Sequence, residues 1–252
     1  MRIAQLIAVI AMTAVFGLSA YAAPPLRVAT EGAYPPFNYI DENGDLVGFD
    51  VDITKALCTA MGQECTIETI PWQQLLEKLA SGEVDLIVAS MARTPEREQI
   101  ADFSDYYYRS RSMFVGLPNT SINLTPYSDE QLTIATQSHT VQEQYLREQY
   151  PQSKTLACTT IQEAFTALIQ GKADAVLIDS LTVFDFLQTD AGKPYDIIGP
   201  ALPPNNTSSE ARIAVAKGNK QLLERINKAL RTIRLNGEFS RINHMYFPFS
   251  IY

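Results

Sequence analysis

"LLEKLASGEVDLIVAS", residues 75–90, combines a helical pattern, a glycine turn and an apolar strand, and a related stretch, "AFTALIQGKADAVLIDS", occupies residues 164–180. The matched pairs are Leu76 with Phe165, Leu79 with Leu168, Gly82 with Gly171, Asp85 with Asp174, and Ser90 with Asp179 at the strand ends. A helix followed by a turn and a buried strand is the repeating unit of an α/β fold. The sequence therefore predicts α/β architecture in two similar halves.

A second internal match supports this division. "RVATEG" (27–32) corresponds to "TIATQS" (133–138), which places Glu31 opposite Gln137. Duplication of a lobe and convergence on common α/β patterns both explain such matches. In either case each half presents polar residues at the carboxyl ends of its strands, where open α/β sheets bind ligands. Two such edges that face each other would form a cleft.

The remaining elements follow from apolar periodicity. We expect strands near 26–30, 65–70 and 84–89, and helices near 50–61 and 72–80. Asp50 is the expected N-cap of the first helix and Gly62 its end. A late helix with an apolar face suggests that the chain returns to the first half, with crossings at 110–115 and 204–211; that face comprises Leu222, Leu223, Ile226, Leu230 and Ile233.

Residues 1–22 have the pattern of a secretory signal peptide. Arg2 precedes an apolar run from Ile3 to Leu18, and "SAYAA" then offers a small-x-small cleavage site at Ala22. A membrane anchor would need about 20 apolar residues and a stop-transfer pattern. No cysteine lies at the cleavage site, which argues against a lipid anchor. We predict an exported protein.

Charge and length narrow the function. Removing 22 of the 252 residues leaves 230, enough for one large or two modest domains. Loss of Arg2 changes the net charge from -8 to -9. Such a chain lacks the basic patch that binds nucleic acid or anionic lipid. The composition favours a small-molecule partner.

The three cysteines suggest one disulfide. Cys58 and Cys65 flank the expected helix end, where the chain turns back into a strand, so we expect them to pair in an exported protein. Cys158 is then an inert, buried thiol. The two histidines lie far apart, and no zinc-type ligand spacing occurs. We expect no metal and no cofactor.

"ASMARTPEREQI" contains a candidate anion site. Thr94 is the expected N-cap of a helix and Pro95 its first residue, which puts Arg97 in the first turn. A cation there opposes the helix dipole, unless the guanidinium and the free backbone N–H groups share an anion. A solvated arginine paired with Glu98 or Asp102 is the equally simple alternative.

Two positions in the second half complement Arg97. A helix expected to begin near Thr140 would direct a second amino end towards the same anion. Asp179 closes an apolar strand, where it could bind an ammonium group or cap the next helix. Arginine for a carboxylate and aspartate for an ammonium group match the two poles of an α-amino acid.

Tyr34 and Trp72 are the aromatic candidates for contact with a ligand side chain, although either could belong to the core. A cationic side chain could lie between the two rings and end at Glu31, whose simpler role is that of a solvated loop acid. Motifs of serine hydrolases, P-loop NTPases and dinucleotide-binding enzymes are absent from the sequence. An acid–base lyase is still compatible, since it needs only a well-placed carboxylate.

At these positions the sequence resembles the polar amino acid solute-binding proteins of bacterial ABC importers, which include lysine/arginine/ornithine-, histidine-, glutamine- and octopine-binding proteins. The resemblance rests on "YPPFNYIDENGDLVGFDVDI", "SMARTPER", "ADFSDYYY", "GKADAVLID" and "LRTIRLNGEFSRINHMYF". It implies a type II periplasmic binding protein fold, with two α/β lobes, a two-strand hinge and a ligand cleft. The implied segments are 23–110 and 207–252 for lobe 1, and 111–206 for lobe 2.

The resemblance also implies roles for the candidate residues. Arg97 and Thr140 would hold the ligand carboxylate, and Asp179 and Ser90 its α-amino group. Tyr34 and Trp72 would sandwich the side chain, with Glu31 at its far end. Three more residues complete the implied ligand-binding set: Ala89, Ala92 and Thr136. The cysteines at 58 and 65 match the disulfide of the basic amino acid branch, but glutamine-binding relatives also carry an acid at the position of Glu31.

Several positions depart from the family pattern. Ala92 stands where relatives usually have serine or threonine, and Arg93 replaces an apolar residue. "QSHT" replaces a usual Gln-Gly-Ser/Thr-Thr, and "NNTSSEAR" lacks the aromatic-glycine pattern common at the second crossing. These changes affect the carboxylate end of the site and the hinge.

We therefore expect a monomeric periplasmic protein, not an enzyme, that captures an L-amino acid, most simply a basic one, and delivers it to an ABC transporter permease in the inner membrane. One alternative is a lyase similar to cyclohexadienyl dehydratase, with Glu31, Asp179 or His139 as proton donor. Another is a periplasmic sensor module for an amino acid.

Overall fold

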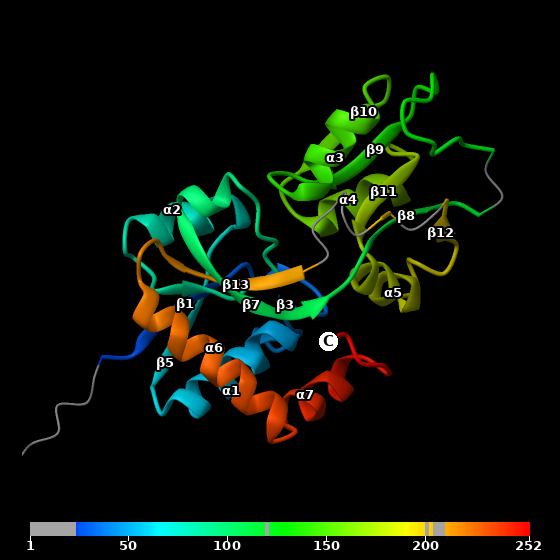
Figure 1. Ribbon diagram of the computed structural model, residues 1–252. Helices are drawn as coiled ribbons and strands as arrows, with labels where there is room; N and C mark the ends of the chain where they lie inside the picture. Colours follow the sequence, from blue (N-terminus) through cyan, green and yellow to red (C-terminus); the bar gives the residue numbers. More distant parts are fainter. Residues whose placement is uncertain (1–23, 119–120, 200–201, 204–209) are drawn as a thin grey trace, which may run out of the picture.

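The computed structural model describes residues 24–118, 121–199, 202–203 and 210–252. This part of the chain forms two α/β lobes, each built on a five-stranded sheet (Figure 1). The predicted signal peptide lies outside the described residues. Within them, no helix combines the length and the apolar character that crossing a membrane requires.

The sheet of the first lobe has the strand order β5-β1-β6-β13-β7. Its strands are β1 (Leu26–Thr30), β5 (Cys65–Thr69), β6 (Leu86–Ile87), β7 (Ala101–Arg109) and β13 (Glu210–Ala216). β1 runs parallel to β5 and β6, so the carboxyl ends of these three strands share one edge. β13 is antiparallel to β6 and β7 and brings the last part of the chain back to this lobe.

Helices cover both faces of this sheet (Figure 1). α1 (Phe49–Met61), α6 (Lys220–Leu235) and α7 (Glu238–Tyr246) pack on one face, and α2 (Leu75–Ala80) packs on the other. The predicted apolar face of α6 is buried at Leu222, Ile226, Leu230 and Ile233, while Leu223 is only partly buried. A small sheet of β2 (Ala33–Tyr34), β3 (Asn38–Ile40) and β4 (Leu46–Val47) follows β1.

The start of α1 differs from the sequence prediction. Gly48 occupies the N-cap position with a φ of 124°, and a Cβ atom there would lie 2.3 Å from the carbonyl oxygen of Phe37. The prediction that Asp50 is the N-cap is wrong. The Asp50 carboxylate is fully buried and accepts hydrogen bonds from side chains of other segments. At the other end, Gly62 adopts the expected left-handed conformation.

The sheet of the second lobe has the order β10-β9-β11-β8-β12. Its strands are β8 (Ser112–Gly116), β9 (Thr133–Gln137), β10 (Lys154–Cys158), β11 (Ala175–Asp179) and β12 (Asp196–Ile198). α4 (Ile161–Ile169) and α5 (Ser180–Gln188) pack on one face, and α3 (Val141–Gln149) packs on the other. β9, β10 and β11 are parallel, which again aligns their carboxyl ends.

The internal repeat has the same geometry in both lobes. The Asp85 N–H group donates to the carbonyl oxygen of Arg27, and the Asp85 carboxylate accepts from the Arg27 N–H group, both at 2.8 Å. Asp174 makes the same two bonds to Thr133, at 2.8 and 2.7 Å. The glycine three residues before each aspartate has a positive φ, of 75° and 65° respectively. Each aspartate thus fastens the start of one parallel strand to its neighbour.

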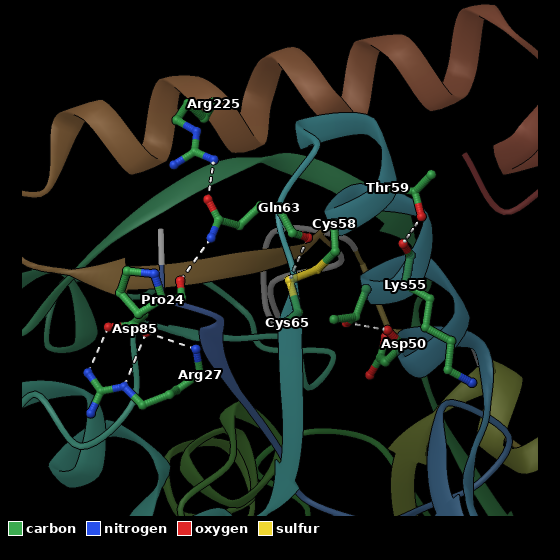
Figure 2. The surroundings of a disulfide bond; sticks show 11 residues. Pro24, Arg27, Asp50, Lys55, Cys58, Thr59, Gln63, Cys65, Asp85 and Arg225 are labelled. Atoms are coloured by element: carbon green, nitrogen blue, oxygen red, sulfur yellow. Dashed lines mark hydrogen bonds and ion pairs between the residues drawn. A yellow bond between two sulfur atoms is a disulfide. The ribbon is translucent and has the colours of Figure 1, made fainter. Parts of the chain in front are cut away.

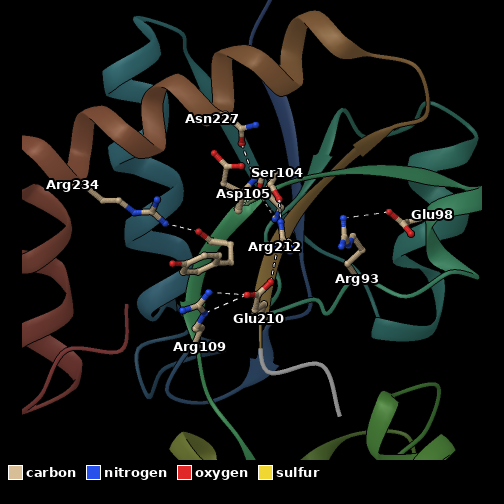
Figure 3. Close-up of polar contacts among 11 residues, drawn as sticks. Arg93, Glu98, Ser104, Asp105, Arg109, Glu210, Arg212, Asn227 and Arg234 are labelled. Carbon is tan, nitrogen blue, oxygen red and sulfur yellow. Dashed lines mark hydrogen bonds and ion pairs between the residues drawn. The ribbon is translucent and has the colours of Figure 1, made fainter. Parts of the chain in front are cut away.

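The first crossing between the lobes is shorter than predicted. β7 ends at Arg109 in the first sheet and residues 112–116 already form β8 in the second, so Ser110 and Arg111 connect the sheets. Most of the second predicted crossing, residues 204–209, lies outside the described residues. The last two residues of that predicted crossing, Glu210 and Ala211, already belong to β13, and Glu210 pairs with Arg109 at 3.0 Å (Figure 3).

Cys58 and Cys65 form the expected disulfide (Figure 2). It joins the last turn of α1 to the first residue of β5, with the two Cα atoms 6.2 Å apart. This is the amino end of β5, opposite the sheet edge at which the parallel strands end. Cys158 is half-buried rather than buried, and the partial burial raises the pKa of its thiol.

Candidate functional site

A cavity lies between the lobes, at the carboxyl ends of the parallel strands. Its wall combines residues of both lobes. The lining residues are Glu31, Tyr34, Trp72, Ala89, Ser90, Ala92, Arg97, Tyr108, Ser110, Gln137, Thr140, Val141, Gln142, Ile178, Asp179, Glu210 and Ala211. Nine of the ten residues assigned from the sequence are among them. The tenth, Thr136, is not.

Thr136 lies inside the second lobe instead of at the cavity. It is fully buried in β9, and its hydroxyl donates to the carbonyl oxygen of Leu177 at 2.8 Å. Side chains alternate along a strand, so Gln137 takes the place next to the cavity. Gln137 was not assigned from the sequence, although its match with Glu31 in the internal repeat was the signal that could have found it.

The four buried charged side chains of the described chain gather in this one region. They are Glu31, Asp50, Arg97 and Asp179. Three of them line the cavity, and Asp50 bonds to Ser90, which also lines it. Buried charges are rare unless they are paired or functional. Three acids and one base give the region an excess of negative charge when all are ionised.

Among the residues that the structure describes, Arg97 is the single buried cation. Its Nη1 donates to the carbonyl oxygen of Ala92 at 2.7 Å, its Nη2 donates to that of His139 in the other lobe at 3.0 Å, and the guanidinium lies over Trp72, 5.1 Å from the ring centroid. Within the described chain, no carboxylate forms an ion pair with it. Burial lowers the pKa of Arg97 to about 10, so it is protonated at neutral pH.

The surroundings of Arg97 correct two sequence expectations. Residues 97–99 form a single 3-10 turn, and no α-helix begins at Pro95; the Thr94 hydroxyl still accepts from the Arg97 N–H group, at 3.3 Å. The alternative of a solvated arginine is also wrong, because Arg97 is buried. Its exposed neighbour Arg93 is the residue that pairs with Glu98, at 3.6 Å (Figure 3).

Asp179 performs the capping role and also lines the cavity. Its carboxylate accepts from the N–H group of Leu181 at 2.8 Å in the first turn of α5, and from the hydroxyl of Ser110 in the crossing. Burial raises the pKa of Asp179 to about 6. The two functions proposed from the sequence are therefore compatible in one side chain.

Thr140 is the N-cap of α3, as predicted. Its hydroxyl oxygen accepts from the N–H group of Glu143 at 3.2 Å, and the hydroxyl donates to the carbonyl oxygen of Gln137 at 2.6 Å. His139, one residue earlier, has a φ of 61°. This left-handed turn directs the His139 carbonyl oxygen towards the first lobe, where Trp72 Nε1 at 3.3 Å and Arg97 both donate to it.

Glu31 and Tyr34 line another part of the cavity wall. The Gln137 amide donates to Glu31 Oε1 at 2.6 Å, and burial raises the pKa of Glu31 to about 7. The Tyr34 ring stacks on Phe37 with the centroids 5.6 Å apart, and burial raises its pKa well above the ordinary value. Tyr34 and Trp72 both line the cavity, so they are more than core residues.

The site as a whole combines one buried cation, Arg97, with the buried acids Glu31 and Asp179 and the rings of Tyr34 and Trp72. The described part of the chain gathers no cluster of three or more His, Cys, Asp or Glu side chains that could hold a metal ion. Eight lining residues were not assigned to the site from the sequence: Tyr108, Ser110, Gln137, Val141, Gln142, Ile178, Glu210 and Ala211. The arrangement suits a small zwitterion with a positive charge on its side chain.

Comparison with known proteins gives the family. The profile of bacterial extracellular solute-binding proteins, family 3, matches residues 26–249. An L-arginine-binding protein of Pseudomonas aeruginosa is 36% identical and covers 94% of each chain. The ABC transporter arginine-binding protein 1 of Escherichia coli is 31% identical over 94% of this chain and 97% of its own.

A solved structure agrees with these relatives. An ancestral arginine-binding protein bound to arginine superposes with a TM-score of 0.82 at 30% identity, covering 88% of this chain and 98% of its own. All three relatives are named as binding proteins and not as enzymes, and the solved structure shares the fold described here. The chain described here belongs to the family 3 bacterial extracellular solute-binding proteins.

Proposed function

We propose that the protein is a periplasmic receptor that captures an L-amino acid with a cationic side chain and delivers it to an ABC transporter permease of the inner membrane. One observation carries the proposal: the four buried charged residues of the described chain, Glu31, Asp50, Arg97 and Asp179, all lie at or directly behind one cavity between the lobes. The arginine- and ABC-transporter names of the relatives support the choice of ligand and of partner.

The poles of the ligand would divide between the lobes. Arg97, in the first lobe, and Thr140, in the second, would hold the α-carboxylate, since Arg97 has no carboxylate partner in the described chain and Thr140 borders the same cavity. Asp179, in the second lobe, and Ser90, in the first, would hold the α-ammonium group. A ligand bound in this way favours the closed arrangement, because both lobes contact it only there.

The cationic side chain would lie between Tyr34 and Trp72 and end at Glu31. Three acids against one arginine leave an excess of negative charge, which a ligand with net charge +1 reduces and a neutral amino acid does not. Ala89 and Ala92 would supply the apolar wall at the carboxylate end.

The same proposal covers processing and organisation. Residues 1–22 would be removed on export, lobe 1 would comprise 23–110 and 207–252, and lobe 2 would comprise 111–206. The mature protein would act as a monomer. Intact mass and size-exclusion chromatography with light scattering on protein recovered from the periplasm test these points. A chain that retains its first 22 residues would contradict the processing step.

Calorimetric titration of the mature protein, freed of bound ligand by unfolding and refolding, tests the ligand class. The panel is L-arginine, L-lysine, L-ornithine, L-histidine, L-glutamine and octopine, with the fluorescence of Trp72, the single tryptophan, as a second signal. We expect binding of arginine, lysine or ornithine to exceed that of glutamine by more than tenfold. Equal affinity for glutamine and arginine would overturn the cationic preference, and no binding of any amino acid would overturn the proposal as a whole.

A further inference from the structure

A fully buried carboxylate, Asp50, lies directly behind the cavity wall. It accepts three side-chain hydrogen bonds, from Ser90 Oγ at 2.9 Å, from Asn38 Nδ2 at 2.8 Å and from the Tyr107 hydroxyl at 2.6 Å. Of these partners only Ser90 lines the cavity. Asp50 can therefore influence a ligand through Ser90 without touching the ligand.

Two backbone N–H groups fix the direction of the hydrogen bonds in this network. The Gly32 N–H group donates to Asn38 Oδ1 at 2.8 Å, so the amide nitrogen of Asn38 must face Asp50. The Ser90 N–H group donates to the Tyr107 hydroxyl oxygen at 2.9 Å, so the Tyr107 proton is directed at Asp50. Both neighbours of the carboxylate are thus donors, as an ionised acid requires.

The ionised Asp50 determines where the Ser90 hydroxyl proton points. An ionised carboxylate only accepts hydrogen bonds, so the Ser90 hydroxyl must donate to Asp50 and keep its lone pairs for the cavity. We propose that Asp50 is a positioning residue that holds the Ser90 hydroxyl as a hydrogen-bond acceptor for the α-ammonium group of the ligand. The inference rests on the proposed function, because it takes the ammonium group to lie at Ser90 and Asp179.

The opposite wall of the cavity repeats this arrangement. The Ser110 hydroxyl donates its proton to the buried carboxylate of Asp179. The lone pairs of the Ser110 oxygen can therefore accept hydrogen bonds from a ligand. Ser90 and Ser110 both line the cavity. Two hydroxyls that each send their proton to an acid form a pair of acceptors, which suits an ammonium group with its three donors and disfavours a carboxylate or a carbonyl oxygen.

The backbone at Ser90 is held by the same network. Its φ of 53° is in the left-handed region, which a serine rarely adopts. The hydrogen bonds of Ser90 to Tyr107 and Asp50 hold this conformation, and Asn38 connects Asp50 to the loop of Gly32, next to Glu31. Asp50 thereby couples the two strand ends that carry the first-lobe part of the site.

The test compares L-arginine with 5-guanidinopentanoate, which is arginine without its α-amino group. Affinities are measured at pH 7.5 by calorimetry, or by competition in Trp72 fluorescence for the weaker ligand. In Asp50→Asn, one carboxylate oxygen becomes an amide nitrogen, which donates, and the negative charge that holds the Ser90 proton is lost, so the preference for arginine over the analogue should fall about tenfold or more. Affinity for the analogue itself should change by less than about threefold, because it has no ammonium group to lose.

A matched control separates positioning from stability. Ser104 is also buried in the first lobe, on β7 (Figure 3). Its hydroxyl accepts from the Ile213 N–H group at 2.9 Å, and it does not line the cavity. Ser104→Ala should leave the ratio of the two affinities unchanged even if it lowers the melting temperature. If Asp50→Asn fails to fold, Tyr107→Phe removes one donor to Asp50 and the acceptor for the Ser90 N–H group, and should reduce the same ratio.

A double-variant comparison tests the route through Ser90. If Asp50 acts on the ammonium group through that hydroxyl, adding Asp50→Asn to Ser90→Ala should change arginine affinity less than about threefold. Equal losses for arginine and the analogue in Asp50→Asn would overturn the inference but leave the proposed function intact. Failure of the parent protein to prefer arginine over the analogue would instead count against the proposed function.

Discussion

Gln137 Nε2 lies 2.6 Å from Oε1 of Glu31, so equivalent strand-end residues of the two lobes meet across the cavity. Both are buried, and Gln137 has a weaker contact to the Thr159 carbonyl oxygen at 3.3 Å. The amide is a neutral donor to an acid, whereas a guanidinium or ammonium group is a charged one and bonds to it more strongly. A cationic ligand can therefore replace Gln137 as the hydrogen-bond donor to Glu31.

Removal of that acid should change ligand preference. We predict that Glu31→Gln lowers affinity for arginine and lysine by about 10- to 100-fold, because a hydrogen bond to a charged group contributes about 1.5–3 kcal/mol. Affinity for glutamine should fall by less than about threefold. Calorimetry at pH 8 measures both. A uniform loss for arginine and glutamine would show that Glu31 does not contact the side chain.

Glu31→Gln, which should weaken binding, should at the same time stabilise the unliganded protein. Burial raises the pKa of Glu31 from an ordinary 4.5 to about 7. The folded state then binds this proton more tightly than the unfolded state, so the contribution of Glu31 to stability falls as pH rises from about 4.5 to 7. We predict that Glu31→Gln is more stable than the parent by about 1–3 kcal/mol at pH 8 and not at pH 4.5.

Urea unfolding at the two pH values measures this difference in the free energy of unfolding. Glu42→Gln is the control, because Glu42 is an exposed acid in the loop between β3 and β4. It should show no pH-dependent gain. A gain of equal size at pH 4.5 and pH 8 would mean that it arises from packing and not from the titration of Glu31.

Arg97 should be needed by every amino acid ligand. It is the one buried cation of the described chain and has no carboxylate partner there. Because the α-carboxylate is common to all amino acids, Arg97→Ala should reduce affinity for arginine, lysine and glutamine alike, by about 100-fold or more. Arg93→Ala is the matched control, since Arg93 is exposed and pairs with Glu98. Retained glutamine binding in Arg97→Ala would refute the assignment.

The disulfide should contribute to stability and not to binding. Cys58 and Cys65 are seven residues apart, and closing so short a loop stabilises the fold by about 2–3 kcal/mol on the chain-entropy account. The bridge lies at the amino end of β5 (Figure 2), whereas the residues that line the cavity lie at the carboxyl ends of the strands. Cys58→Ser/Cys65→Ser should therefore unfold at lower urea concentration with unchanged arginine affinity, and Cys158→Ser should change neither.

The parts of the fold that the sequence predicted well are those with local signals. Alternating strands and helices, the two glycine turns and the apolar face of α6 depend on residues close together in the chain. Nine of the ten assigned site residues line the cavity, because strand ends and the family resemblance both point to them. These signals specify position along the chain more directly than they specify partners.

The errors arise where distant residues compete for one side chain. Asp50 has a good local reason to cap α1, but Asn38, Ser90 and Tyr107 bind its carboxylate inside the lobe. Thr136 and Gln137 are adjacent on β9, so their side chains point to opposite sides of the strand. The family resemblance did not indicate that Gln137, and not Thr136, lies at the cavity. The donors that gather at a buried acid come from several segments, and no local pattern in the sequence announces them.

A contact at the rim of the cleft should set the ease of closure. Gln73 Nε2, in the first lobe, donates to Ser138 Oγ at 3.0 Å and to the Thr159 carbonyl oxygen at 2.9 Å, both in the second lobe. Gln73 does not line the cavity. Its bonds therefore stabilise the closed arrangement whatever ligand is inside, and we predict that Gln73→Ala weakens arginine, lysine and glutamine binding by the same factor, about 3- to 10-fold.

Stopped-flow measurement of Trp72 fluorescence should show that Gln73→Ala dissociates from its ligands faster than the parent protein. The reason is that the protein must open before the ligand can leave, and the loss of these bonds makes opening easier. Gln74→Ala is the control, because Gln74 is the exposed neighbour whose side chain makes no such contact within the described chain. A loss confined to one amino acid would place Gln73 in the ligand contact and not at the closure. Equal losses for all three ligands, with unchanged ratios between them, would instead show that Gln73 acts on closure and not on selectivity.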